Sequence, residues 1–375
     1  MLKKITSFLI FLICINANSQ YYKLSSQSNV SLITCGSGNE LYSIYGHTAL
    51  RFTDIENNLD VVFNYGNFDF GTPNFYLKFV KGDLQYFVGA CSFNDFMQEY
   101  RESNRAVFEQ ILILSSDQKQ QLYEQLSSAV FSDERFYTYK FIDKNCTTMV
   151  LDKINSIYGH NIIKKNTNIE NSYRTILYGF LDNHFWENFG INIIFGAKVD
   201  KPATKLFLPE ELMQNLKISK FKGQLIAKNI EVLNKKNQVE SQFSFWNSVY
   251  PFMIFLLLLM FINNKIINIV YFLILGFIGL FFSTVGLYSF HQEIYYNYNI
   301  LFFNPLLLLL VYFIFRNQTQ WILRMLYFNL ICLLIYIIVL INKPHLLMML
   351  PMILCNGFLF VKMLLSQKNL LTSVK

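Results

Sequence analysis

Long apolar stretches separated by short polar breaks dominate the chain from Trp246 onward. Each stretch is long enough to cross a bilayer as a helix. The polar breaks contain Asn, Lys, Arg and Gln and fall at about 263–265, 291–299, 316–320 and 342–344. The pattern therefore predicts an all-α membrane domain in residues 246–375, with five transmembrane helices. These are expected at about 246–262, 266–289, 299–315, 321–341 and 345–365.

The preceding residues show the mixed periodicities of an α+β domain, which we place at residues 20–219. Short β-branched or alternating runs predict strands, and apolar positions spaced three or four apart predict helices. A hairpin is expected around Lys81-Gly82-Asp83, and a Lys- and Asn-rich linker at residues 220–245. Strands are expected at 30–35, 48–53, 61–65, 107–114 and 135–141, and helices at 92–102, 116–130 and from 145.

The first 19 residues have the pattern of a secretory signal peptide. Two lysines at positions 3–4 precede an apolar run at 5–15, and Ala17 and Ser19 fit the −3 and −1 positions of a cleavage site. The apolar run is short for a spanning helix, although an uncleaved anchor is an alternative. In either case the α+β domain is expected to be exported.

The charge of the chain reflects membrane topology. Hydrophobic residues make up 53% and charged residues 15%, against about 25% charged in ordinary globular proteins. The net charge is +7, but only one of the 25 acidic residues, Glu293, lies after position 245, beside seven basic ones. The remainder is nearly neutral, which argues against a nucleic-acid partner. With the first domain outside, six of these basic residues lie on the cytoplasmic side and only Lys343 outside, as the positive-inside rule requires.

Three residues of the exported domain form a candidate catalytic set. His47 opens a strand, Asn64 lies on the next strand, and Cys146 begins a helix. A thiol in the first helical turn is favoured as thiolate, an imidazole can carry its proton, and an amide can orient the imidazole. Each residue alone also has a structural interpretation, as a buried filler, a strand-edge histidine or a turn former. No second ligand at metal-binding spacing accompanies His47 or Cys146, so we expect no metal.

The order His, polar residue, Cys at a helix start resembles that of circularly permuted papain-like (NlpC-like) thiol enzymes, including lecithin–retinol acyltransferase relatives. More closely, the chain resembles the Lnb-type lipoprotein N-acyltransferases, which combine a periplasmic domain with a five-helix membrane domain. The matching segments are LITCGSGNELYSIYGHTALRF (32–52), VVFNYGNFDFGTPNFYLKFVKG (61–82), FIDKNCTTMV (141–150) and WENFGINIIFGAKVDKPATKLFLPEEL (186–212).

This resemblance implies an inner-membrane enzyme of lipoprotein maturation with a periplasmic domain and a cytoplasmic C-terminus. Its substrates would be a phospholipid acyl donor and the α-amine of the lipidated N-terminal cysteine of lipoproteins, with no cofactor. Cys146 would be the nucleophile, His47 the general base and then acid, and Asn64 the orienting group. Asp54 and Asp69 are alternatives for the third role, each with an interpretation as a surface-turn residue.

Two other functions fit the same sequence. A membrane-bound cysteine peptidase or amidase would use the same Cys146 and His47, and a non-catalytic envelope protein would use neither. The outer loop with His291 and Glu293 is either a lipid-headgroup site or a hydrated loop. Arg51 and Arg105 are either phosphate ligands or ordinary surface arginines, and Cys35 and Cys91 are either a disulfide or two thiols.

Overall fold

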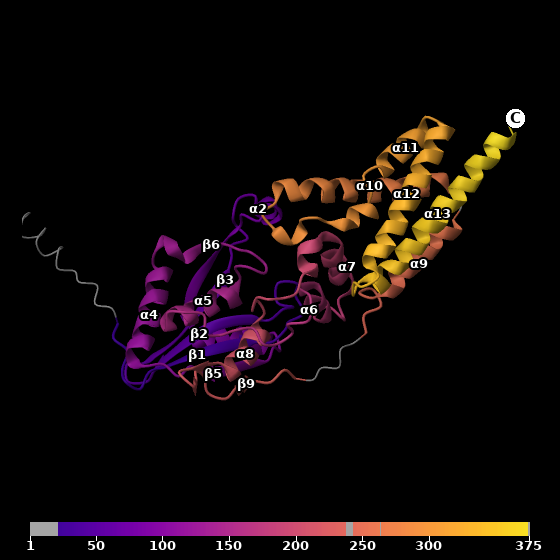
Figure 1. Ribbon diagram of the computed structural model, residues 1–375. Helices are drawn as coiled ribbons and strands as arrows, with labels where there is room; N and C mark the ends of the chain where they lie inside the picture. The colour runs from indigo at the N-terminus through magenta and orange to yellow at the C-terminus, as the bar shows by residue number, and fades with distance from the viewer. Residues whose placement is uncertain (1–21, 238–242, 263, 374–375) are drawn as a thin grey trace, which may run out of the picture.

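A seven-stranded antiparallel sheet forms the centre of the N-terminal domain in the computed structural model, which describes residues 22–237, 243–262 and 264–373 (Figure 1). The predicted signal peptide lies outside these ranges. The strand order is β6-β4-β3-β2-β1-β5-β9. The strands are β1 (Asn29–Cys35), β2 (His47–Asp54), β3 (Leu59–Asn67), β4 (Gln85–Ser92), β5 (Val107–Ile111), β6 (Phe136–Thr138) and β9 (Glu231–Asn234).

Alternation along the central strands gives the sheet two apolar faces. Leu50 and Phe52 of β2 pack in the larger of two clusters, with Val150 and Ile154. Ala49 packs on the opposite face, in a cluster with Phe96 and Met97. Successive side chains of a strand point to opposite faces, so a sheet covered on both sides needs apolar residues at both parities.

Helices cover these two faces. The helix α3 (Phe93–Glu102) lies on one face, whereas α4 (Ser116–Val130), α5 (Cys146–Tyr158) and α8 (Pro209–Ile218) contribute to the larger cluster on the other. Ser115 and Gln118 form a capping box at the start of α4, which fixes its first turn. Between the sheet and the membrane helices lie α6 (Tyr173–Gly179) and α7 (Phe185–Ile194), as Figure 1 shows. The predicted α+β class is thereby confirmed.

Two segments differ from the sequence-based expectation. The hairpin expected around residues 81–83 is instead the end of a helix, α2 (Phe75–Lys81), because Gly82 adopts a left-handed conformation with φ 74° and caps it. The expected linker at 220–245 contains the short strands β7 (Lys220–Phe221) and β8 (Gln224–Leu225) and the edge strand β9, which pairs with β5. The polar composition of 220–237 predicts a linker, but β9 forms a strand there because it pairs with the distant β5.

The described part of the predicted membrane domain is mostly α-helical. Within the described residues, three helices are long and apolar enough to cross a bilayer: α10 (Lys265–Tyr288), α12 (Thr319–Leu340) and α13 (Leu346–Ser373). The other two are shorter, α9 (Val249–Phe261) with 13 residues and α11 (Leu307–Phe315) with 9. Thirteen helical residues span about 20 Å, against about 30 Å for the hydrocarbon core. Five spans therefore remain a prediction, and three are supported.

The shortness of α11 has a local cause. Asn304 and Pro305 precede it, and the Asn304 side chain accepts a hydrogen bond from the Leu306 backbone N–H at 2.9 Å. This irregular segment presses on α10, where a Cβ on Gly279 would lie 1.8 Å from the Phe303 carbonyl oxygen. In this non-helical segment a buried side chain forms a hydrogen bond with a backbone N–H group. Non-helical segments at membrane depth need such partners, because lipid supplies none.

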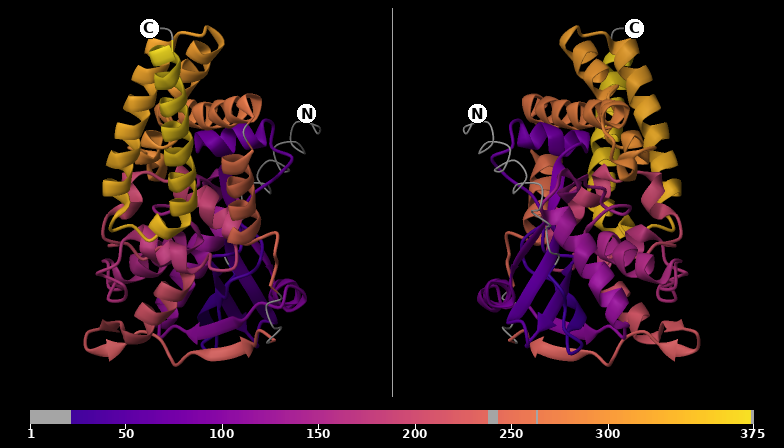
Figure 2. Two further views of the ribbon diagram at one scale, coloured as in Figure 1. Left: turned by 90° about the vertical axis from the view of Figure 1, so that its right-hand side faces the viewer. Right: turned by 90° about the vertical axis from the view of Figure 1, so that its left-hand side faces the viewer.

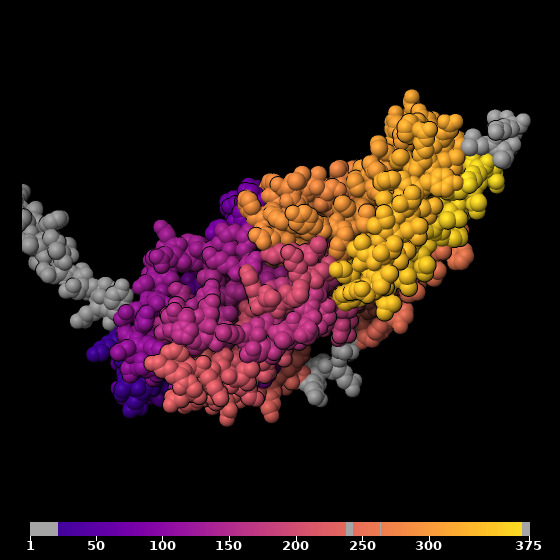
Figure 3. Space-filling view, in the orientation of Figure 1, coloured from indigo at the N-terminus to yellow at the C-terminus, as the bar shows by residue number. Residues whose placement is uncertain are grey.

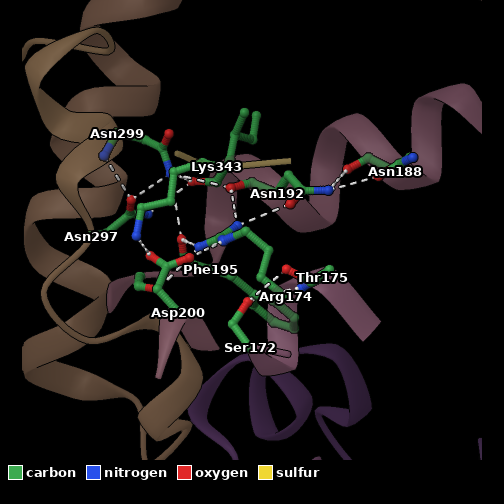
Figure 4. Close-up of polar contacts among 12 residues, drawn as sticks. Ser172, Arg174, Thr175, Asn188, Asn192, Phe195, Asp200, Asn297, Asn299 and Lys343 are labelled. Atoms are coloured by element: carbon green, nitrogen blue, oxygen red, sulfur yellow. Dashed lines mark hydrogen bonds and ion pairs between the residues drawn. The ribbon is translucent and has the colours of Figure 1, made fainter. Parts of the chain in front are cut away.

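The two regions are joined by a buried polar network (Figure 4). Arg174 on α6 is 1% exposed and donates to Asp200, to Asn192 and to the carbonyls of Phe195 and Gly196 at 2.7–3.0 Å. The amide of Asn299, from the loop before α11, donates to the Ile193 carbonyl at 2.9 Å. Apolar contacts between α7 and Phe252 of α9 surround the network. Figure 2 shows the resulting arrangement, with the sheet beneath the helical region.

Candidate active site

The candidate histidine begins β2 at the edge where three strands end. The preceding Gly46 has φ +82°, and a Cβ there would lie 2.6 Å from the Cys35 carbonyl oxygen, so only glycine fits. The register pairs Cys35 of β1 with His47 and Ala49 of β2 with Asn64 of β3. This pairing brings the ends of the three strands to one edge of the sheet.

Cys146 is the first residue of α5, and Asn145 is its N-cap. The Asn145 side-chain oxygen accepts from the N–H groups of Thr147 and Thr148 at 2.9 and 3.0 Å. Its amide nitrogen donates to the carbonyls of Phe141 and Phe207 at 2.8 and 2.9 Å. All the hydrogen-bonding groups of this side chain thus serve to fix the start of the helix. At position N1 the Cys146 N–H has no intrahelical acceptor and points outward from the helix start.

The structure brings the three predicted residues together. His47 Nε2 donates to the Asn64 side-chain oxygen, and the imidazole and the Cys146 thiol are near enough for each to shift the pKa of the other. Gly66 completes this edge with φ +102°: a Cβ there would lie 3.5 Å from His47 Cε1 and 3.7 Å from Cys146 Cβ. With Nε2 bonded to Asn64, Nδ1 is the ring nitrogen free to exchange a proton with the thiol.

A second contact holds β2 against α5 beside the thiol. The hydroxyls of Thr48 and Thr147 lie 3.1 Å apart, and both residues are buried. The Thr147 hydroxyl also lies 4.0 Å from the Cys146 sulfur. These threonines were not singled out from the sequence, although each directly follows a candidate residue.

Electrostatics favour a charged thiol–imidazole pair. Burial acts to raise the pKa of Cys146, but the charge of His47 and hydrogen bonds from His47, the Thr48 backbone and Thr147 outweigh it, and the pKa falls below its ordinary value. Burial acts to lower the pKa of His47, but Cys146 and then Asn64 outweigh it, and the pKa rises. Opposite shifts of two adjacent groups stabilise thiolate and imidazolium together.

The two aspartates considered for the third position lie elsewhere. Asp54 is at the far end of β2 and accepts hydrogen bonds from Ser25 and Asn57 at 2.6–2.8 Å. Asp69 is exposed and accepts from the Gly71 N–H at 2.7 Å within a turn. Asn64 is therefore the residue that contacts His47, and the aspartates stabilise turns.

The remaining candidates from the sequence have structural partners. Arg51 is paired with Asp60 and Glu109, and Arg105 is buried and donates to the Gly36 carbonyl at 2.9 Å. Neither is an exposed arginine available to phosphate. Cys35 and Cys91 are both free thiols, and burial raises the pKa of Cys35 to about 12.

The loop between α10 and α11 is not a hydrated loop. Glu293 is 2% exposed, and His291 Nε2 lies 2.8 Å from the Phe79 carbonyl oxygen of α2. The loop is thus part of the contact between the two regions. Among the described residues, no cluster of His, Cys, Asp and Glu side chains has the geometry to hold a metal ion.

Aromatic residues form one wall near the thiol. The rings of Tyr86 and Tyr139 stack at 4.4 Å, and Cys146 packs against the apolar cluster that contains Tyr65, Tyr86 and Tyr137. None of these rings was singled out from the sequence. They come from three different strands or strand ends, and only the fold brings them into the cluster against which Cys146 packs.

The fold and the site define a class of protein: an α+β domain with a paired thiol and imidazole, joined to apolar helices able to span a membrane. Residues 16–178 match the family model of the Lnb N-terminal periplasmic domain. The match supports assignment of the chain to the Lnb family and, with the apolar helices, fits an inner-membrane protein. Searches of curated proteins and of solved structures gave no match to the chain. The circularly permuted papain-like topology therefore remains a prediction.

Proposed function

We propose that this protein is a lipoprotein N-acyltransferase that moves a fatty acyl chain from a phospholipid to the α-amine of the lipidated N-terminal cysteine of lipoproteins. The observation that carries the proposal is the Cys146–His47–Asn64 set on a domain locked to membrane helices, in a chain that matches the Lnb periplasmic domain. Both substrates of such a reaction are held in a bilayer, so the nucleophile must be positioned at its surface.

The first step forms an acyl-enzyme. The Cys146 thiolate attacks the ester carbonyl carbon of the phospholipid, and the C–O bond to the glycerol oxygen breaks. His47 as imidazolium gives its proton to that oxygen, which leaves as the hydroxyl of a lysophospholipid. Asn64 holds the other ring nitrogen and so fixes the orientation of the imidazole.

The second step transfers the chain to the amine. The neutral α-amine attacks the thioester carbonyl carbon, and the C–S bond breaks to release the thiolate. His47 accepts the proton lost by the nitrogen, which restores the starting thiolate–imidazolium pair. An amide is more stable than a thioester, so neither nucleotide nor metal is required to drive the transfer.

The start of α5 supplies the electrostatic stabilisation. The free Cys146 N–H and the positive end of the helix dipole face the place where negative charge develops on the carbonyl oxygen. The Asn145 cap holds this turn in place through its contacts to Phe141 and Phe207.

The test is mass spectrometry of a reporter lipoprotein's N-terminal peptide from cells that lack this protein and are re-supplied with variants. We expect N-acylation with wild type and with Cys91→Ala, a thiol on β4 outside the site, and none with Cys146→Ala. Restoration by Cys146→Ala would exclude Cys146 as nucleophile. If wild type fails to restore the N-acyl chain, lipoproteins are not the acceptor and a cysteine amidase or peptidase becomes the better proposal.

The proposed location is the inner membrane, with the α+β domain in the periplasm, a cleaved signal peptide and five spans ending in the cytoplasm. The excess of basic residues on one side of the predicted spans supports this orientation. Fusing an export-dependent phosphatase or a cytoplasm-dependent fluorescent protein to the C-terminus tests it. An active phosphatase fusion would contradict the odd number of spans.

A further inference from the structure

An exposed apolar segment projects from the N-terminal domain beside the membrane helices. It comprises α2 and the residues just before it, and no residue of α2 is buried. Tyr76 is 76% exposed and Leu77 65%, and Phe70, Phe79 and Val80 are also exposed. Clustered exposed aromatic and aliphatic side chains mark a contact surface on a protein.

The segment is fixed to the end of a candidate membrane span. Ser289, the residue that follows α10, donates through its hydroxyl to the Val80 carbonyl at 2.7 Å, and the Phe290 N–H donates to the Lys81 carbonyl at 2.7 Å. His291 meets the Phe79 carbonyl, and Lys140 donates to the carbonyls of both Gly82 and Phe290. In Figures 1 and 3 the violet α2 segment lies against the orange end of α10.

This attachment determines what the segment faces. The helix α10 has 24 residues and is apolar enough to cross a bilayer, so its end is expected at a membrane–water boundary. The segment α2 is held within hydrogen-bonding distance of that end. Aromatic side chains with lysines, here Lys78 and Lys81, are the composition of segments that lie in the interface between headgroups and acyl chains.

A row of aromatic rings leads from this segment toward the thiol. The ring centroid of Phe70 lies 4.9 Å from those of both Phe75 and Phe68, and the centroids of Phe68 and Tyr86 lie 5.2 Å apart. Tyr86 then stacks on Tyr139 and belongs to the cluster against which Cys146 packs. A series of ring contacts thus runs from the exposed segment to the apolar cluster against which Cys146 packs.

We propose that Phe70–Val80 is a bilayer-docking element that inserts its side chains into the outer leaflet and admits a phospholipid acyl chain along the aromatic row to Cys146. The docking stands on the contacts described here, whereas the acyl-chain role rests on the proposed function. The occupant is the phospholipid leaflet itself.

The docking is tested by photo-cross-linking with the full chain in nanodiscs of phosphatidylethanolamine and phosphatidylglycerol. p-Benzoylphenylalanine replaces Tyr76 or Leu77, and in the control it replaces Phe131, a ring that is 90% exposed and follows α4. We expect phospholipid adducts at 76 and 77 in several-fold excess over 131. Equal yields at 131, no lipid adduct, or cross-links to a second chain instead would overturn the docking.

The acyl-chain role has a separate readout. The double variant Tyr76→Ser and Leu77→Ser is expected to slow acyl-enzyme formation from bilayer phospholipid several-fold, while leaving acylation of Cys146 by a water-soluble short-chain ester unchanged. Loss with both donors, or with neither, would overturn this role. Failure of the proposed function appears differently, as lipid adducts at 76 and 77 without any N-acylation of the reporter lipoprotein.

Discussion

At the scale of single residues, two thiols of the same sheet edge have opposite chemistry. Cys35 and Cys146 are near enough to influence each other electrostatically, yet the pKa of Cys35 is raised to about 12 by burial and that of Cys146 is lowered. The difference lies in the partners, since Cys146 alone has the imidazole and the helix start. Reactivity therefore follows from placement and not from residue type.

The first prediction concerns the thiolate of Cys146. Because His47 lowers the pKa of the thiol, alkylation of Cys146 by iodoacetamide is expected to persist below the ordinary thiol pKa, and His47→Ala shifts its pH profile upward. Peptide mass spectrometry across a pH series measures the rate, with Cys91 as internal reference because burial raises its pKa. Identical profiles in wild type and His47→Ala would show that the two side chains are not coupled.

The second prediction concerns Gly66. A residue with a side chain at φ +102° carries backbone strain of about 1–3 kcal/mol, and the new methyl group would touch both His47 and Cys146. Gly66→Ala is expected to lower both the thermal stability of the protein and the rate of acyl-enzyme formation. Gly190→Ala on α7 is the control, since no atom lies within 4 Å of its added Cβ and Ala favours a helix. An unchanged rate of acylation in Gly66→Ala would show that the site still works with a methyl group beside His47 and Cys146.

At the scale of elements, the start of α5 carries most of the site. Its cap, its dipole and its first residue belong to one turn, and β2 and β3 bring the imidazole and the amide to that turn. A helix start is a local feature, whereas its position against the strand ends depends on packing of Val150 and Ile154 under the sheet.

The third prediction separates the capping role of Asn145 from stability alone. Asn145→Ala removes an N-cap, which costs about 0.5–2 kcal/mol, and also leaves the carbonyls of Phe141 and Phe207 without their donor. We expect N-acylation to fall together with thermal stability. Ser115→Ala, which removes the cap of α4, should cost comparable stability with acylation retained. Equal activity losses in the two variants would indicate a general folding defect.

At the scale of the whole molecule, the thiol domain and the membrane helices form one body through α6, α7 and the loop before α11. Arg174 organises the N-terminal side of this contact, because its three guanidinium nitrogens donate to Asp200, Asn192 and Phe195, and its guanidinium lies over the ring of Tyr298. Lys343, from the loop between α12 and α13, pairs with the same Asp200 at 3.0 Å. The contact fixes the position of the N-terminal domain, and with it Cys146, relative to the apolar helices.

The fourth prediction concerns this contact. Arg174→Met leaves several buried carbonyls without their donor and leaves Asp200 with Lys343 alone, and it is expected to cost about 3–5 kcal/mol. Thermal unfolding of the detergent-purified full chain, followed by intrinsic Trp fluorescence, measures the loss. Arg101→Met, at an exposed position of α3, is the control and should change stability by about 0.5 kcal/mol or less. A wild-type Tm for Arg174→Met would show that the hydrogen bonds of Arg174 do not stabilise the N-terminal side of this contact.

Short-range signals in the sequence account for the elements that were predicted correctly. Hydropathy located the C-terminal helical region, and periodicity located five strands of the N-terminal domain and its helices α3, α4 and α5, because both depend on neighbouring residues alone. The segment 220–237 was predicted less well because β9 exists only through pairing with β5, more than a hundred residues away. The hairpin expected at 81–83 failed because Gly82 fits a helix end as well as a turn.

By itself the sequence determined the α+β domain, the helical region that follows it and the candidate residues His47, Asn64 and Cys146. Only the tertiary structure decided that Asn64, and not Asp54 or Asp69, contacts His47, because strand register sets which side chains meet. It also decided that α2 lies at the end of α10 and that Asn299 and Lys343 join the helical region to Ile193 and Asp200 of the N-terminal domain. These contacts link residues far apart in the chain, and their geometry depends on how complete elements pack.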